Sequence, residues 1–191
     1  MTDEQILAEF RAAEALLEGH FILSSGLRSA RYLQCARVLM DPARAARLVA
    51  ALIDKLPAAA RTATAVVAPA MGGVIVGYEV ARQLGIGSMF VERPQGVFEL
   101  RRGFALTPGQ PVLMVEDVVT TGLSSREAIV AIEAAGGKVV GGACLVDRSN
   151  GSADIGVPLT ALLALDVPSF SPDALPPELA ALPAVKPGSR K

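Results

Sequence analysis

The chain has 191 residues, a length typical of one domain, and its 51% hydrophobic and 19% charged residues exclude an intrinsically disordered protein. Lys and Arg number 18 against 19 Asp and Glu, and this net charge of -1 gives the whole chain no electrostatic reason to bind nucleic acid or an anionic membrane. The N-terminus lacks the pattern of a signal peptide and charges interrupt every long apolar stretch, so we expect a cytoplasmic protein without a membrane segment.

The N-terminal part of the chain predicts two helices separated by a hairpin. Apolar residues recur at three- and four-residue spacing over residues 3–18, which is typical of an amphipathic helix. Residues 21–33 form two short extended runs around a Ser/Gly turn, so we expect a hairpin there. Asp41 can cap a second helix over residues 43–56, because Pro42 suits its first position.

The middle of the chain alternates short apolar runs with amphipathic segments. We expect strands at 65–68, 88–91, 112–115 and 139–146, and helices at 74–84 and 125–135. Strands that are apolar throughout need both faces covered, so the pattern predicts an α/β fold with a doubly wound, mostly parallel sheet.

Two further segments differ in composition from the rest. Residues 93–104 are rich in charges and turn formers, which predicts a mobile functional loop or a small β-excursion. Residues 167–191 form a proline-rich tail that should follow the surface, with one short helix near 177–182. We interpret residues 1–191 as a single domain with a small N-terminal hood formed mainly by residues 1–40.

The chemistry is concentrated after the apolar run at 112–115. Glu116 and Asp117 are followed by residues 120–124, which combine hydroxyls with a glycine and open a helix. Backbone N–H groups at a helix N-terminus can cradle a phosphate, and two carboxylates suit ribose hydroxyls or Mg²⁺. The segment therefore predicts a ribose phosphate site. The plain alternative is a strand followed by a capped helix, in which Asp117 and Ser124 satisfy only backbone donors.

Common nucleotide-binding fingerprints are absent from the sequence. The chain has no Gly-x-x-x-x-Gly-Lys-Ser/Thr run, and Gly85-Ile86-Gly87 lacks the third glycine of a dinucleotide fingerprint. Neither an NTPase nor a dehydrogenase is favoured.

The segment Val112 to Ser125 closely resembles the phosphoribosyl diphosphate signature of the type I phosphoribosyltransferases. Residues 67–73 resemble that family's diphosphate loop, where glycine permits close backbone approach. The resemblance implies a set of residues that bind phosphoribosyl diphosphate: Arg93, Glu116, Asp117, Val118, Val119, Thr120, Thr121, Gly122, Leu123, Ser124, Gly72 and Gly73.

The choice of base is indicated by two other segments. Residues 19–29 are similar to the hood that covers the nucleobase in orotate phosphoribosyltransferases, and residues 145–148 are similar to their strand that ends in an orotate-contacting arginine. The resemblance implies that Thr120 and Arg148 contact orotate, whose carboxylate a guanidinium can bind in bidentate fashion. Without the resemblance, Arg148 could form a surface ion pair with Asp147.

The mobile loop departs from the family pattern. Many orotate enzymes carry Arg-Lys-Glu-x-Lys-x-His there, whereas residues 93–104 contain neither lysine nor histidine. We align Arg93 with the first arginine and expect Arg101 and Arg102 to supply positive charge to the departing diphosphate. The expected catalytic residues are therefore Asp117, Glu116, Arg101 and Arg102.

Other positions also differ from the pattern. The lysine often found in the hood is Ser24 here, and the aromatic-lysine pair of the diphosphate loop is Met71-Gly72. His20, the single histidine, could be a general base, but a turn position with a satisfied ring nitrogen explains it equally well.

The resemblance implies transfer of a 5-phosphoribosyl group to orotate in pyrimidine biosynthesis, with Mg²⁺ held mainly through the substrate's diphosphate and ribose and with Asp117 as a candidate ligand. It also implies a homodimer in which loop 93–104 reaches the neighbouring site. Two alternatives stay open: a phosphoribosyltransferase for a purine or uracil, and a non-catalytic nucleotide-binding regulator on the same fold.

Overall fold

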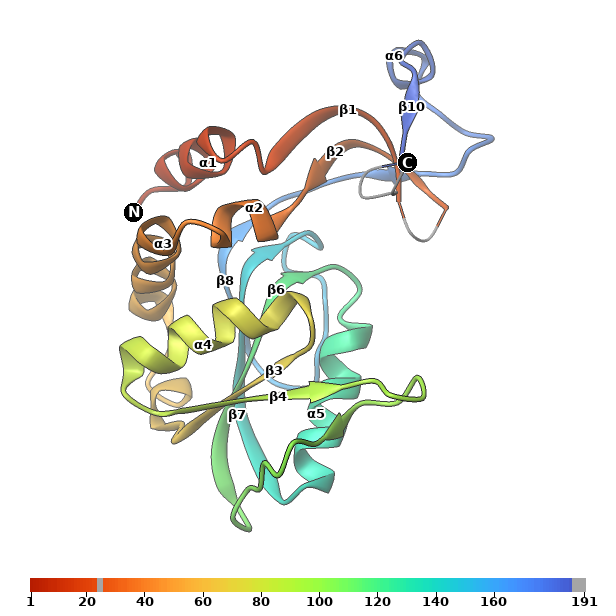
Figure 1. Cartoon of the computed structure of the whole chain (residues 1–191). Helices are drawn as coiled ribbons and strands as arrows, with labels where there is room; N and C mark the ends of the chain where they lie inside the picture. Colours follow the sequence, from red (N-terminus) through yellow and green to blue (C-terminus); the bar gives the residue numbers. More distant parts are fainter. Residues whose placement is uncertain (24–25, 187–191) are drawn as a thin grey trace. The chain divides into compact units, whose positions relative to one another are not determined.

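The computed structural model describes residues 1–23 and 26–186, which form two compact units (Figure 1). One unit contains residues 1–38 together with the segment from 166 onward, and the other contains residues 39–165. The sequence predicts a single domain, whereas the contacts separate two units, because the chain returns after residue 165 to pair with N-terminal strands. Ser24, part of the expected hood turn, lies outside the described residues.

The smaller unit is built on a four-stranded sheet with the order β10-β1-β2-β9. Strands β1 and β2 are antiparallel, which confirms the predicted hairpin. The proline-rich tail contributes β9, β10 and the short helix expected near 177–182. The elements are α1 (Asp3–Ala12), β1 (Leu16–Ile22), β2 (Arg28–Leu33), α2 (Cys35–Leu39), β9 (Ser169–Phe170), α6 (Pro177–Ala180) and β10 (Ala184–Val185).

The helix predicted over residues 3–18 is shorter than expected. It ends at Ala12, and Glu14 has a φ of 49°, a left-handed conformation that a helix cannot continue through. Leu16 and Leu17 belong to β1 instead, where they pair with β2. Their helical spacing was misleading because pairing with a strand elsewhere in the chain determines their structure.

The larger unit contains a six-stranded sheet with the order β5-β4-β3-β6-β7-β8, parallel except for the β4–β5 pair. All four strands and both helices predicted for the middle of the chain are present, whereas β8 was not predicted. The elements are α3 (Pro42–Lys55), η1 (Ala60–Thr62), β3 (Ala65–Pro69), α4 (Gly72–Leu84), β4 (Gly87–Glu92), β5 (Glu99–Leu100), β6 (Gln110–Val119), α5 (Leu123–Ala134), β7 (Gly137–Asp147) and β8 (Leu159–Ala164).

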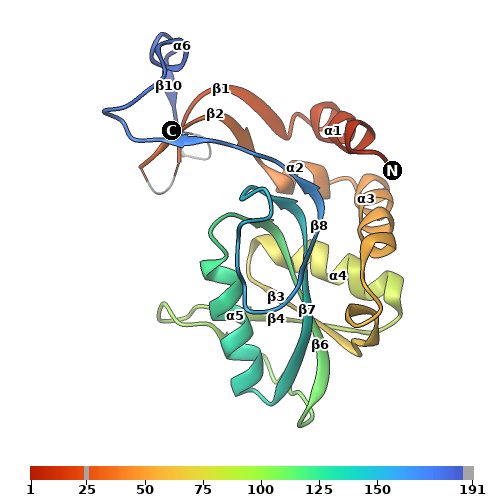
Figure 2. The same ribbon diagram turned by 180° about the vertical axis from the view of Figure 1, so that it is seen from behind.

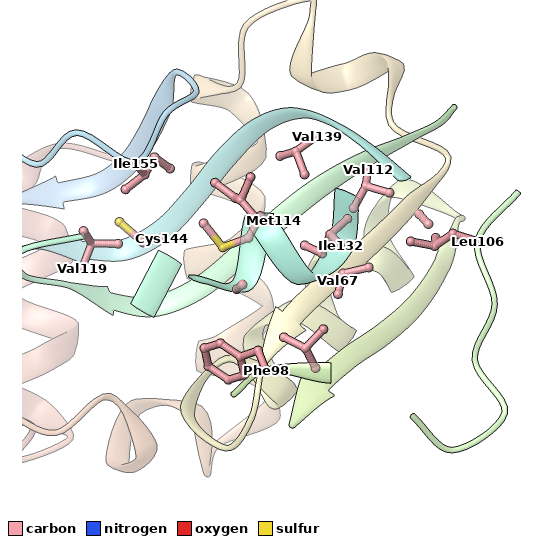
Figure 3. Close-up of a cluster of buried hydrophobic side chains, with 14 residues drawn as sticks. Val67, Phe98, Leu106, Val112, Met114, Val119, Ile132, Val139, Cys144 and Ile155 are labelled. Atoms are coloured by element: carbon pink, nitrogen blue, oxygen red, sulfur yellow. The ribbon is translucent and has the colours of Figure 1, made fainter. Parts of the chain in front are cut away.

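Helices cover both faces of this sheet, as Figures 1 and 2 show. Along β3, Val67 packs in a buried cluster with Ile132 of α5 (Figure 3). The next residue faces the other way, since a Cβ atom added to Gly77 of α4 would lie 2.8 Å from the Cβ atom of Ala68. The doubly wound α/β fold is therefore confirmed.

The two cysteines, Cys35 and Cys144, are buried free thiols, as expected. Within residues 1–23 and 26–186, no helix is long and apolar enough to cross a membrane.

Candidate active site

The predicted diphosphate loop and the predicted acidic pair and turn lie at the ends of the central strands β3 and β6. These strands are parallel neighbours, so their carboxyl ends meet at the same edge of the sheet, where ligands bind in folds of this kind. Strand β6 runs to Val119, four residues beyond the predicted end, so Glu116 and Asp117 lie within the strand, and Glu116 is in register with Cys144 of β7. The longer strand fixes the backbone of both acidic residues.

Glu116 is held by the first turn of α5. The buried Ser125 donates a hydrogen bond from its hydroxyl to Glu116 Oε2. Burial raises the pKa of Glu116 to about 7, and the charge of Asp117 adds to the rise, whereas the Ser125 hydrogen bond and the charge of Arg93 oppose it. Glu116 therefore changes charge near neutral pH.

Asp117 lies against the loop that follows β3. Burial raises the pKa of its carboxyl, an effect opposed by hydrogen bonds from backbone N–H groups. Its carboxylate leaves no room for a side chain on Gly72, and a Cβ atom on Gly73 would lie 2.9 Å from the carbonyl oxygen of Val115. The two glycine positions thus let the predicted diphosphate loop lie directly against β6.

The turn after β6 surrounds a hollow of about 180 Å³. Gly122 precedes α5 with a φ of +75°, and a Cβ atom there would lie 2.9 Å from Ile155 Cγ2, so glycine is required on both counts. The N–H groups in the first turn of α5 have no intrahelical acceptor, and that of Leu123 donates to Thr121 Oγ1 at 3.4 Å. N–H groups at such a helix N-terminus can bind an anion. The hollow is lined by Glu116, Val118, Val119, Thr120, Thr121, Gly122, Leu123, Ser124 and Ser125.

Arg93 reaches the rim of this hollow. Its Nη2 lies 3.3 Å from Ser124 Oγ and also forms an ion pair with Glu127 of α5. The guanidinium carbon lies 4.0 Å from the centre of the Phe98 ring, a cation–π contact. The start of segment 93–104 is therefore attached to α5.

The rest of that segment folds back along β4, which fits the predicted β-excursion; its mobility stays a prediction. Arg102 forms two hydrogen bonds with Glu92, from Nε at 2.8 Å and from Nη2 at 2.9 Å, and this pairing lowers the pKa of the Glu92 carboxyl. Arg101 is exposed and takes part in none of the ion pairs found among the described residues. The two arginines expected to act together thus differ in their surroundings.

Thr120 and Arg148 lie next to each other, because each directly follows the end of one of two neighbouring strands, β6 and β7. Val119 is in register with Asp147, and the N–H of Arg148 donates to the carbonyl oxygen of Val119 at 2.8 Å. The buried carboxylate of Asp147 accepts hydrogen bonds from the N–H and hydroxyl of Ser149 and from the N–H of Gly151. Asp147 therefore organises the turn that carries Arg148.

Three residues near the site were not predicted. Ser125 is the hydrogen-bond partner of Glu116, while Phe98 and Glu127 hold Arg93. Ser125 stands next to the predicted cradle, so its position was a usable signal, whereas an exposed glutamate on a helix carries none. His20 lies within β1 and not at a turn, which corrects the expectation of a turn position. Its buried ring has Nδ1 3.0 Å from the carbonyl oxygen of Leu182, which favours a structural role.

Known proteins are similar to this chain in sequence and in fold. The model of the phosphoribosyl transferase domain matches residues 38–157. A relative from Rhizorhabdus wittichii named orotate phosphoribosyltransferase is 72% identical over 191 residues, covering 100% of this chain and 97% of the relative. One of the same name from Novosphingobium aromaticivorans is 67% identical, covering 100% and 98%. A crystal structure of orotate phosphoribosyltransferase from Aeropyrum pernix matches with a TM-score of 0.73 and 26% identity, covering 84% of this chain and 93% of that one.

Proposed function

This chain belongs to the orotate phosphoribosyltransferases, enzymes that transfer a phosphoribosyl group, and we propose that it transfers the 5-phosphoribosyl group of phosphoribosyl diphosphate to N1 of orotate. The products are orotidine 5′-monophosphate and diphosphate, in the biosynthesis of pyrimidines. The observation that carries the proposal is the hollow at the end of β6, where an acidic pair lies beside the N-terminus of a helix.

The 5′-phosphate is assigned to the hollow. Its lining by the turn 120–124 supplies hydroxyls from Thr120, Thr121 and Ser124 together with backbone N–H groups. The positive end of the α5 dipole favours a dianion at this place. Arg93 adds a guanidinium at the rim, beside Ser124.

The ribose and the diphosphate are assigned to the neighbouring groups. Glu116 and Asp117 supply carboxylate oxygens for the two ribose hydroxyls and can stabilise positive charge that develops on the sugar when the anomeric C–O bond breaks. Gly72 and Gly73 bring backbone amides within reach of a diphosphate, since the loop lies against Asp117. This arrangement mainly positions the substrate and stabilises separating charge.

Mg²⁺ fits this donor set as a cofactor. Hard oxygen ligands suit the ion, and the pair of carboxylates offers two of them, of which Asp117 is the candidate ligand. Among the described residues no group of three or more His, Cys, Asp or Glu side chains could hold a metal, so most ligands would have to come from the substrate's diphosphate and ribose. When bound, the ion would neutralise charge on the diphosphate.

The base is assigned to the ends of β6 and β7. Orotate carries a carboxylate, and Arg148 can bind it through two parallel N–H groups while Thr120 offers a hydroxyl. The neighbouring positions of these residues support the assignment. Arg101 and Arg102 are assigned to the charge on the departing diphosphate.

The assembly and the location are further parts of the proposal. We expect a homodimer in which loop 93–104 reaches the neighbouring site, and measurement of the mass in solution tests it. A cytoplasmic location fits a reaction between two anions, because charged groups do not enter an apolar bilayer readily.

The experiment that tests the reaction follows orotate absorbance in mixtures of the purified protein with phosphoribosyl diphosphate, with and without Mg²⁺. Uracil, adenine, guanine and hypoxanthine replace orotate in parallel mixtures. Consumption of orotate only in the complete mixture is the expected result. Activity with another base would keep the phosphate and ribose assignments but overturn the base site. Inactivity with every base would favour a non-catalytic nucleotide-binding protein.

A further inference from the structure

The ion pair with Arg93 links Glu127 of α5 to the site. Both side chains are partly exposed, with relative exposures of 35% for Arg93 and 44% for Glu127. An ion pair of this exposure adds little to folding stability. The main effect of this ion pair is therefore to fix the position of the Arg93 guanidinium.

Three contacts fix the position of that guanidinium. Phe98, buried in the core of the larger unit, lies under its face, while Ser124 and Glu127 lie at its edge. Ser124 lines the hollow assigned to the 5′-phosphate. A guanidinium has five N–H donors in a planar fork, so Arg93 can keep Glu127 and donate to a phosphate at the same time.

We infer that Glu127 is a positioning residue, which aims Arg93 at the phosphate hollow and thereby joins phosphate binding to the fold of segment 93–104. This inference rests on the proposed function, because it takes the hollow as the 5′-phosphate site. Binding of the sugar phosphate therefore reinforces the contacts between the start of this segment and α5. Without Glu127 the long side chain of Arg93 can adopt several rotamers. The entropy lost in ordering it then weakens substrate binding.

The first test measures binding of ribose 5-phosphate by calorimetry, which needs no turnover. Glu127→Gln keeps the shape of the side chain and removes its charge, and we expect the Kd to rise about 10-fold, as expected when a charge-assisted contact is lost. Glu133→Gln, an exposed position on the same helix, serves as the matched control and should bind as the wild type does. Thermal unfolding of both variants should match the wild type, since the exposed pair adds little stability.

The second test asks whether Glu127 acts through Arg93. Arg93→Ala should weaken ribose 5-phosphate binding, and adding Glu127→Gln to Arg93→Ala should cause no further loss, because the positioned group is already absent. Losses that multiply in the double variant would overturn the inference, as would unchanged binding by Glu127→Gln. In the kinetic assay, Glu127→Gln should raise the KM for phosphoribosyl diphosphate and leave the KM for orotate unchanged.

The same experiment separates this inference from the function on which it rests. Wild-type protein that fails to bind ribose 5-phosphate overturns the assignment of the hollow itself. Wild-type binding with an unaffected Glu127→Gln variant leaves that assignment intact and removes only the role of Glu127.

Discussion

A Cβ atom built on Gly72 would lie 2.5 Å from Asp117 Oδ1, so the first residue of α4 touches the carboxylate that projects from β6. This contact joins two segments 45 positions apart in the sequence, the loop after β3 and the acidic pair. Any side chain at position 72 must displace the carboxylate. The position of Asp117 therefore depends on a glycine in another element.

Gly72→Ala is expected to lower kcat/KM for phosphoribosyl diphosphate by about 10-fold or more, since a small displacement of a catalytic group has a large effect on rate. Folding should be maintained, because alanine favours a helix more than glycine does. Steady-state kinetics and a thermal melt give both results. Gly87→Ala is the control, since a Cβ atom there has no neighbour within 4 Å. Equal activity of the two variants would show that displacing Asp117 has no cost.

Asp117→Asn tests the charge of that carboxylate without changing its shape. We expect kcat to fall about 100-fold, the effect of removing one group that stabilises developing charge. The midpoint of thermal unfolding should stay the same or rise, because burial already penalises the charged form, as the raised pKa indicates. Near-normal turnover would remove Asp117 from the catalytic set. Asp173→Asn, an exposed change in the smaller unit, is the control.

Glu116 makes folding stability depend on pH. Its pKa rises from 4.5 to about 7 on folding, so the folded state binds more protons between these values and the free energy of unfolding falls as the pH rises through this window. The full loss is on the order of 3 kcal/mol, reached above pH 7. Glu116→Gln should therefore be more stable than the wild type at pH 8 and similar to it near pH 4.5. Urea unfolding at both pH values measures the difference, and an equal difference at the two values would contradict the assignment.

Local patterns predicted the elements whose own apolar pattern is enough to indicate their secondary structure. The apolar runs of β3, β6 and β7 predicted the parallel sheet. The turn after Asp117 predicted residues that line the hollow, because they are contiguous in the chain. The end of α1 was missed because Leu16 and Leu17 continue the helical spacing while pairing with β2. No local pattern indicates such a partner.

The same distinction applies to the site. The contact between Arg93 and Ser124 joins residues 31 positions apart, and that of Gly72 with Asp117 joins residues still further apart. The family resemblance implied that both pairs serve one ligand. Their contact depends on strand order and on the packing of α5 and α4, which only the folded chain determines.

Arg148→Ala tests the base site. The variant loses a bidentate partner for the orotate carboxylate, so we expect the KM for orotate to rise about 10-fold or more, with little change in the KM for phosphoribosyl diphosphate. Kinetics with each substrate varied in turn give the two values. Equal effects on both would place the base elsewhere. Arg11→Ala, at an exposed ion pair of α1, controls for the loss of one positive charge.

Arg101 and Arg102 should contribute unequally to turnover. Arg102 is paired with Glu92 through two hydrogen bonds, so part of its charge is neutralised and its side chain is held along β4. Arg101 is exposed on the same segment and takes part in none of the ion pairs found among the described residues. The positive charge available to a departing diphosphate should therefore come chiefly from Arg101.

Arg101→Ala is accordingly expected to lower kcat about 10-fold or more, and Arg102→Ala to lower it less, with kcat measured at saturating concentrations of both substrates. Arg101→Lys should recover part of the loss, because it restores the charge without the planar fork. Unchanged kcat in both alanine variants would show that neither residue replaces the missing lysines. A larger effect at Arg102 would mean that its ion pair with Glu92 breaks during the reaction. Arg102 would then become available to the diphosphate only when the segment closes.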